Sequence, residues 1–194
     1  RQGAAWFGSR GESLLLSAVH WIRPHADAVA MMMMEAAVAV AEAVGEVVDP
    51  RQVAIKWPND VELSRRKVAG ILVEAVAGPS SAGDPRRAVV IGVGVNVNQT
   101  AEGFPSEIRG LACSLQSAAG RRVDRVLVLG RLLDRLEACL GEASSAEGRG
   151  RLHDRYMARS DMVGREVAIR EAGRTFRGTV TSISPHYALV LRLE

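Results

Sequence analysis

The sequence has few aromatic residues and few cysteines, and its longest apolar stretch is broken by charge. Aromatic side chains make up 4% of the 194 residues, which disfavours the stacking platforms that bind single-stranded nucleic acids. No apolar run approaches the roughly 20 residues that a membrane-spanning helix needs. The longest such stretch, from Ala26 to Val48, is interrupted by four acidic residues, Asp27, Glu35, Glu42 and Glu46. It therefore predicts a buried helix, and no membrane association is expected.

Cysteine and histidine are too sparse to form a metal cluster. The two cysteines, Cys113 and Cys139, lie outside any CxxC motif, and the four histidines are scattered. Two distant cysteines in a chain without a visible secretory signal indicate reduced thiols. We therefore expect a cytoplasmic protein.

The charge is balanced and dispersed. The net charge is +3 and no dense basic tract is present, so a mixed solvated surface is favoured over a nucleic-acid patch. Hydrophobic residues account for 47% of the chain and charged residues for 24%, which is typical of a globular protein with a sizeable core. The chain begins at Arg1 in what reads as a loop, so we expect a natural segment to precede it.

The residue pattern predicts strands around one long helix in the first half. The helix runs from Ala28 to about Glu46, capped by Asp27, and its run of four methionines predicts burial on most of its circumference. Strands are expected at Ser13–Arg23, Val53–Lys56, Val61–Leu63, Lys67–Ala77 and Ala88–Asn98, separated by turn-forming segments at 57–60, 64–66 and 78–87.

The second half is predicted to be helical first and then extended. Apolar residues recur at spacings of three and four from Val123 to Leu140, which predicts an amphipathic helix. A polar break is expected at Glu142–Gly150, followed by a helical turn at Arg151–Arg159. From Met162 the pattern predicts three short strands, Glu166–Arg170, Arg174–Ile183 and Tyr187–Leu193, in a small β-barrel-like module.

Three segments carry possible chemistry. In Lys56-Trp57-Pro58-Asn59-Asp60, a lysine can hold phosphate and a carboxylate can hold Mg²⁺, although a plain turn is the favoured explanation of this segment taken alone. In Lys67–Glu74, Lys67 opens an apolar strand and is either functional or an ordinary edge lysine. Gly70 marks a bulge or a close ligand approach. In Gly92–Asn98, glycines at alternate positions clear one strand face for a flat ligand.

Taken in order, KWPNDV, KVAGILVE and GVGVNVN resemble the biotin–protein ligase family. Residues 1–6 resemble the end of that family's glycine- and arginine-rich biotin loop, and the tail from Met162 resembles its small SH3-like domain. The resemblance implies an α+β fold with a mixed or antiparallel sheet flanked by helices, related to class II synthetases. It implies a catalytic domain over 1–160, incomplete at its N-terminus, and an SH3-like β-module over 161–194.

The resemblance also implies the reaction and the roles of residues. Biotin and ATP would form biotinyl-5′-AMP, and the biotin would pass to a lysine of a biotin carboxyl carrier protein. The implied catalytic residues are Lys67, Arg1 and Asp60. The implied biotin-binding residues are Arg1, Lys67, Ala69, Gly70, Ile71 and Gly94. The implied ATP-binding residues are Trp6, Lys56, Asn59, Asp60 and Asn96, with Asp60 also a ligand of Mg²⁺. The sequence leaves open whether the chain forms a homodimer, and nucleic-acid binding would require a helix-turn-helix before Arg1.

Two departures from the family pattern and three alternatives stay open. Ala4 stands where the loop's second arginine is expected, and the strand that precedes the loop is absent. The alternatives are lipoate or octanoyl transfer on the same fold, a degenerate biotin-binding regulator without catalysis, and a purely structural α/β protein.

Overall fold

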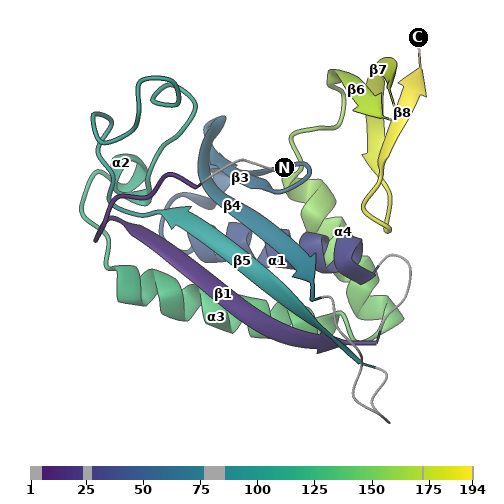
Figure 1. The fold of residues 1–194 in the computed structure, drawn as a ribbon, viewed down its shortest axis with the longest axis horizontal. Helices are drawn as coiled ribbons and strands as arrows, with labels where there is room; N and C mark the ends of the chain where they lie inside the picture. Colours follow the sequence, from purple (N-terminus) through teal and green to yellow (C-terminus); the bar gives the residue numbers. More distant parts are fainter. Residues whose placement is uncertain (1–5, 24–27, 77–85, 172, 194) are drawn as a thin grey trace.

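A five-stranded antiparallel sheet forms the centre of the molecule. The computed structural model describes residues 6–23, 28–76, 86–171 and 173–193. The strand order is β1-β5-β4-β3-β2, from β1 (Ser13–Ile22), β2 (Val53–Lys56), β3 (Asp60–Leu63), β4 (Arg66–Ala75) and β5 (Arg87–Asn96). Neighbouring strands pair antiparallel throughout. Helices cover one face of this sheet (Figure 1), so the expected α+β class is confirmed.

Helix α1 (Ala28–Gly45) lies against the sheet and is the core helix. It is long and apolar enough to cross a membrane by composition alone, but 61% of it is buried inside the protein. Residues 36–40 are completely inaccessible. The predicted burial of the methionine-bearing helix is therefore confirmed, while its proposed cap at Asp27 lies outside the described residues.

The described residues contain four further helices, the short η1 (Pro50–Gln52) and α2 (Leu115–Ala119) and the longer α3 (Arg125–Glu142) and α4 (Ala146–Arg159). Of these, η1, α3 and α4 contact α1. The predicted polar break at 142–150 is wrong, because α4 already begins at Ala146. The Ser145 hydroxyl accepts a hydrogen bond from the backbone N–H of Gly148 and so caps the helix.

The tail forms a second, three-stranded sheet. Its order is β6-β7-β8, from β6 (Glu166–Glu171), β7 (Arg174–Ile183) and β8 (Leu189–Leu193). The three expected strands are present, but the last begins at Leu189 and not at Tyr187. Tyr187 instead has a positive φ of 67° in the turn between β7 and β8, and its side chain is buried. The division into domains at residue 160 stays a prediction.

Candidate active site

The open face of the sheet carries a row of residues with a gap at its centre. Across the strands, Leu15 of β1 pairs with Gly94 of β5, Gly94 pairs with Gly70 of β4, and Gly70 pairs with Asp60 of β3. The two central members have no side chain. The row therefore leaves a depression floored by backbone between Leu15 and Asp60, as the alternate-glycine pattern predicted.

This depression is a cavity of about 350 Å³, which we call the glycine cavity. Its volume is in the range of small-molecule sites. Its lining contains seven of the residues proposed from sequence together with other residues of β1, β4 and β5: Trp6, Leu15, Leu16, Ser17, Asn59, Asp60, Lys67, Gly70, Ile71, Leu72, Gly92, Val93 and Gly94. Ile71 is only 2% exposed and belongs to the core, so it offers mainly its backbone to the cavity.

The Trp6 indole lies over the two glycines in this structure. A Cβ added to Gly94 would come within 2.6 Å of the indole, and one added to Gly70 within 2.9 Å. The Lys67 ammonium stands 5.6 Å from the ring centroid, a cation–π arrangement. The indole N–H is buried without a hydrogen-bond partner. Trp6 therefore fills space that only glycines leave open.

Lys67 and Asp60 form the charged edge of the cavity. The Lys67 Nζ lies 2.6 Å from Asp60 Oδ1, with side-chain exposures of 36% and 23%. A register shift between Val61 and Glu62 on β3 adjusts the pairing between these two strands. Both groups remain accessible to a ligand while holding each other in place.

The Trp57–Asp60 turn is braced from two sides. Asn59 donates its side-chain amide to the Ile71 carbonyl at 3.1 Å, and the Ile71 N–H donates to the Asn59 carbonyl at 2.9 Å. From the second sheet, the Tyr187 hydroxyl donates to the Pro58 carbonyl, and the Trp57 indole N–H donates to the Tyr187 carbonyl at 3.0 Å. These bonds fix the backbone that presents Asp60.

A second cavity of about 400 Å³ adjoins the first, and we call it the charged cavity. Its lining is Trp6, Phe7, Lys56, Asp60, Glu62, Arg65, Lys67, Asn96, Phe104, Ile108, Leu111 and Ala112. Trp6, Asp60 and Lys67 line both cavities. Inside the charged cavity the Lys56 ammonium pairs with the buried Glu62 carboxylate at 3.1 Å. Two compartments thus share one wall that carries a positive and a negative group.

Asn96 is buried at the edge of the charged cavity and is held by the protein itself. Its amide donates to the Cys113 carbonyl at 3.0 Å and to the Lys67 carbonyl at 3.4 Å. Its oxygen accepts from Gln99 at 3.3 Å. Asn96 therefore anchors the start of β4, and its proposed contact with adenine stays a prediction.

The structure brings together most of the residues proposed from sequence. All of the described ones line one of the two cavities except Ala69, which is fully buried and lines neither. Arg1 and Ala4 lie outside the described residues. Sequence reasoning missed Glu62 and Arg65. The sequence did contain a signal for each of them. Glu62 is a charged residue two positions after Asp60, and Arg65 is an arginine in a two-residue turn.

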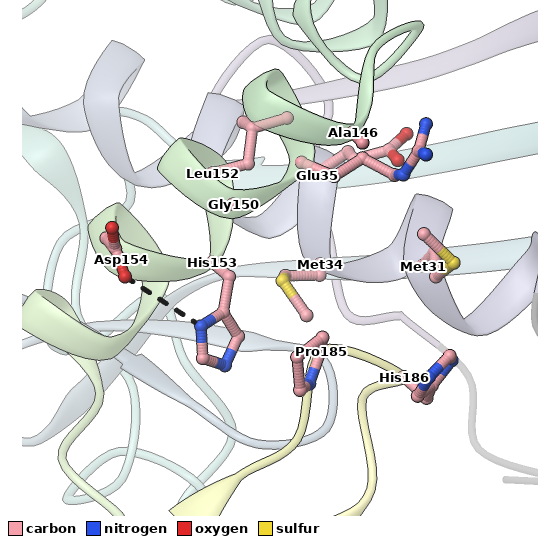
Figure 2. Close-up of a pocket in the computed structure, with 11 residues that line it drawn as sticks. Met31, Met34, Glu35, Ala146, Gly150, Leu152, His153, Asp154, Pro185 and His186 are labelled. Atoms are coloured by element: carbon pink, nitrogen blue, oxygen red, sulfur yellow. Dashed lines mark ion pairs between the residues drawn. The ribbon is translucent and has the colours of Figure 1, made fainter.

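A third cavity of about 380 Å³ lies on the helical side of the sheet, between α1, α4 and the turn at Pro185. Figure 2 shows Met34, His153 and Pro185 converging on it, with Glu35 and Ala146 at another part of its wall. Burial raises the pKa of Glu35 to about 7, opposed in part by Arg149. None of the residues proposed from sequence lines this cavity, so it is separate from the candidate active site.

The described residues contain no group of three or more His, Cys, Asp or Glu side chains that could hold a metal ion. Cys113 and Cys139 are buried free thiols. Burial raises the pKa of each thiol to about 11, so neither is an activated nucleophile. The shared wall itself offers the ammonium of Lys67 and the carboxylate of Asp60, which can stabilise charge and exchange protons.

Comparison with known proteins agrees with this geometry. Residues 1–96 match the biotin/lipoate A/B protein ligase family. The bifunctional ligase/repressor BirA of Bacillus subtilis is 36% identical over 135 residues, which are 69% of this chain and 39% of BirA. The biotin–[acetyl-CoA-carboxylase] ligase of Mycobacterium tuberculosis is 33% identical over 176 residues, which are 89% of this chain and 60% of that ligase.

Among solved structures, the biotin protein ligase of Aquifex aeolicus in complex with biotin and ATP superimposes with a TM-score of 0.77 at 24% identity. That likeness covers 94% of this chain and 72% of the other, and it shows the shared fold. The match covers about two fifths of the length of the two Bacillus BirA proteins. The sequence match, the relatives and the fold agree: the chain belongs to the biotin/lipoate A/B protein ligase family.

Proposed function

We propose that this chain carries the catalytic site of an ATP-dependent biotin–protein ligase. The observation that carries the proposal is the wall shared by the two cavities, where Lys67 and Asp60 meet. A reaction between two substrates needs their reacting atoms to be brought together in a fixed geometry. Biotin in the glycine cavity and ATP in the charged cavity would meet at this wall.

In the first step, a biotin carboxylate oxygen attacks the α-phosphorus of ATP, and pyrophosphate leaves with the electron pair of the broken P–O bond. Negative charge develops on the phosphoryl oxygens. Lys67 is proposed to stabilise that charge and to hold the biotin carboxylate, and its compact ammonium suits two anionic partners. The Arg1 guanidinium is proposed to close over the same groups.

In the second step, the amine of a carrier-protein lysine attacks the carbonyl of biotinyl-AMP, an amide forms, and AMP leaves. The attacking amine must lose a proton. Asp60 is the accessible carboxylate at the shared wall and is proposed to assist this transfer. The proposed acceptor is a biotin carboxyl carrier protein domain; the name of the mycobacterial relative gives acetyl-CoA carboxylase for that protein.

We further propose that Mg²⁺ accompanies ATP. Mg²⁺ commonly takes one or two protein carboxylates and completes its coordination with substrate phosphates and water. The charged cavity offers Asp60 as such a carboxylate, and Glu62 is already paired with Lys56. This set fits a cation carried mainly by phosphates. Mg²⁺ would neutralise phosphate charge in the first step.

Trp6 must change place for this reaction. Its indole now occupies the space over Gly94 and Gly70 that biotin would fill. Its proposed role is to cover the adenine ring, so substrate binding is expected to move the indole out of the glycine cavity. A change in tryptophan fluorescence on biotin addition, absent in Trp6→Phe, would report that movement.

We also propose a location, an oligomeric state and a substrate specificity for the protein. Reduced, buried Cys113 and Cys139 support a cytoplasmic location. Strand β1 at the edge of the sheet exposes Val19 and Trp21, which supports a homodimer. The family also contains lipoate ligases, so specificity for biotin is itself part of the proposal.

The test is direct. The full-length protein is incubated with biotin, ATP and Mg²⁺, and biotinyl-AMP is detected by mass spectrometry. A carrier domain is then added, and biotin should be found on its lysine. Excess lipoate should not compete. Absence of biotinyl-AMP at saturating substrates would refute the proposed function, and a lipoyl product would replace it with lipoate transfer.

A further inference from the structure

The turn between β3 and β4 contains an arginine in an unfavourable backbone conformation. Leu63 and Arg66 are the last paired residues of the hairpin, so Ser64 and Arg65 form a two-residue turn with φ of 48° and 65°. Two positive φ values define the turn type that favours Asn-Gly. A side chain at the second position is strained, and such strain concentrates at functional sites. A function for Arg65 would explain why glycine is absent.

Arg65 is also the cation of the charged cavity that has no acidic partner. Three cations line this cavity: Lys56, Arg65 and Lys67. Lys56 pairs with Glu62 and Lys67 pairs with Asp60. Among the described residues, no carboxylate forms an ion pair with Arg65, and the residue is exposed. The lining therefore contains one cation more than it contains carboxylates, and Arg65 is the cation that is left over once the two lysines are paired.

We propose that Arg65 binds the β- and γ-phosphates of the ATP that reacts at Lys67. This inference rests on the proposed function. Lys67 follows Arg65 by two residues, so their Cα atoms are at most about 7 Å apart. An α-phosphate at Lys67 would direct the rest of the triphosphate along the hairpin towards the turn. A guanidinium can engage phosphate oxygens in two parallel hydrogen bonds, which an ammonium cannot do in the same fixed geometry.

Arg65 would act on the nucleotide and on the departing pyrophosphate, not on biotin. The glycine cavity does not include Arg65, so biotin affinity should be independent of it. It would also supply a phosphate-binding arginine to a sequence that has Ala4 where an arginine is expected. Arg10 is exposed and lines neither cavity, so it is less well placed for this purpose.

The test compares Arg65→Gly with Arg66→Ala in the full-length protein. Glycine adopts the turn conformation without strain, so Arg65→Gly should melt at the same temperature as the wild type or higher. Its KM for ATP, from biotin-dependent pyrophosphate release, should rise about tenfold, the loss expected for one charge-assisted contact at an exposed site. The KM for biotin should not change. Arg66 is exposed but lies outside both cavities, and Arg66→Ala should match the wild type.

A second measurement does not depend on turnover. Equilibrium binding of a non-hydrolysable ATP analogue should weaken about tenfold in Arg65→Gly and by much less in Arg65→Lys. Unchanged nucleotide affinity in Arg65→Gly would overturn the inference. A higher KM for the carrier domain with an unchanged KM for ATP would also overturn it, and would assign Arg65 to carrier recognition. If the wild type binds the analogue through Arg65 but makes no biotinyl-AMP, the proposed reaction fails while this inference stands.

Discussion

Replacing Lys67 by alanine should slow biotinyl-AMP formation far more than it destabilises the protein. The Lys67 ammonium belongs to the wall between the cavities, and removal of one preorganised transition-state donor lowers kcat by about 10²–10³. The interactions that are lost with the Lys67 side chain contribute little to the free energy of unfolding. The pair with Asp60 is partly exposed, so it contributes at most about 1 kcal/mol. The cation–π contact with Trp6 adds about 0.5–1 kcal/mol.

The assay is pyrophosphate release in a single turnover, with thermal unfolding measured on the same sample. A loss of 1–2 kcal/mol lowers Tm by about 2–4 °C per kcal/mol in a domain of this size, so the variant should remain folded at the assay temperature. Lys67→Arg keeps the charge but should recover little activity. The ammonium is a compact point charge, and the longer, planar guanidinium cannot place its charge at the same point. A near-wild-type rate in Lys67→Ala would remove Lys67 from the mechanism.

Three further changes test separate parts of the structure. Gly94→Ala places a methyl group in the space that the Trp6 indole now fills, 2.6 Å from the indole, and biotin is proposed to fill the same space. The KM for biotin should therefore rise at least about tenfold, which corresponds to more than about 1.4 kcal/mol; an unchanged KM would show that biotin binds elsewhere. The pKa of Glu35 is about 7 in the folded protein against an ordinary 4.5, so between these pH values the folded state binds a proton that the unfolded state has released. The free energy of unfolding therefore falls as the pH rises through that range, by up to about 3 kcal/mol. Glu35→Gln should abolish this part of the decline in urea unfolding at pH 5 and pH 8; the same decline in both proteins would contradict the assignment. Tyr187→Phe removes the hydroxyl that donates to Pro58 and should lower unfolding free energy by about 1 kcal/mol, whereas an unchanged urea midpoint would show that this bond contributes nothing.

The candidate site was largely predictable because its parts are local in sequence. Asp60 and Lys67 lie on two strands joined by a two-residue turn, so the hairpin alone brings them close. The alternate glycines of β5 predict an open strand face, but the depression also requires that β5 pairs with β4, which sets Gly94 beside Gly70. Period-two patterns carry this information, since alternate residues share a face.

The unpredicted features depend on contacts between distant segments. Trp6 reaches the glycines from the N-terminal segment, and no sequence pattern states where an indole will rest. Tyr187 docks on the turn at Trp57 and Pro58 from the second sheet, a contact across about 130 residues. The early start of α4 was different, because the cap at Ser145 is a local signal that the polar composition of the segment obscured.

A crystal structure of the full-length protein with a non-hydrolysable biotinyl-adenylate analogue tests the central claim most directly. The account predicts the biotin rings over Gly70 and Gly94, the phosphoryl group beside Lys67, and the Trp6 indole displaced from the glycine cavity. An analogue bound away from the wall formed by Lys67 and Asp60, or an indole still seated on the glycines, would contradict it.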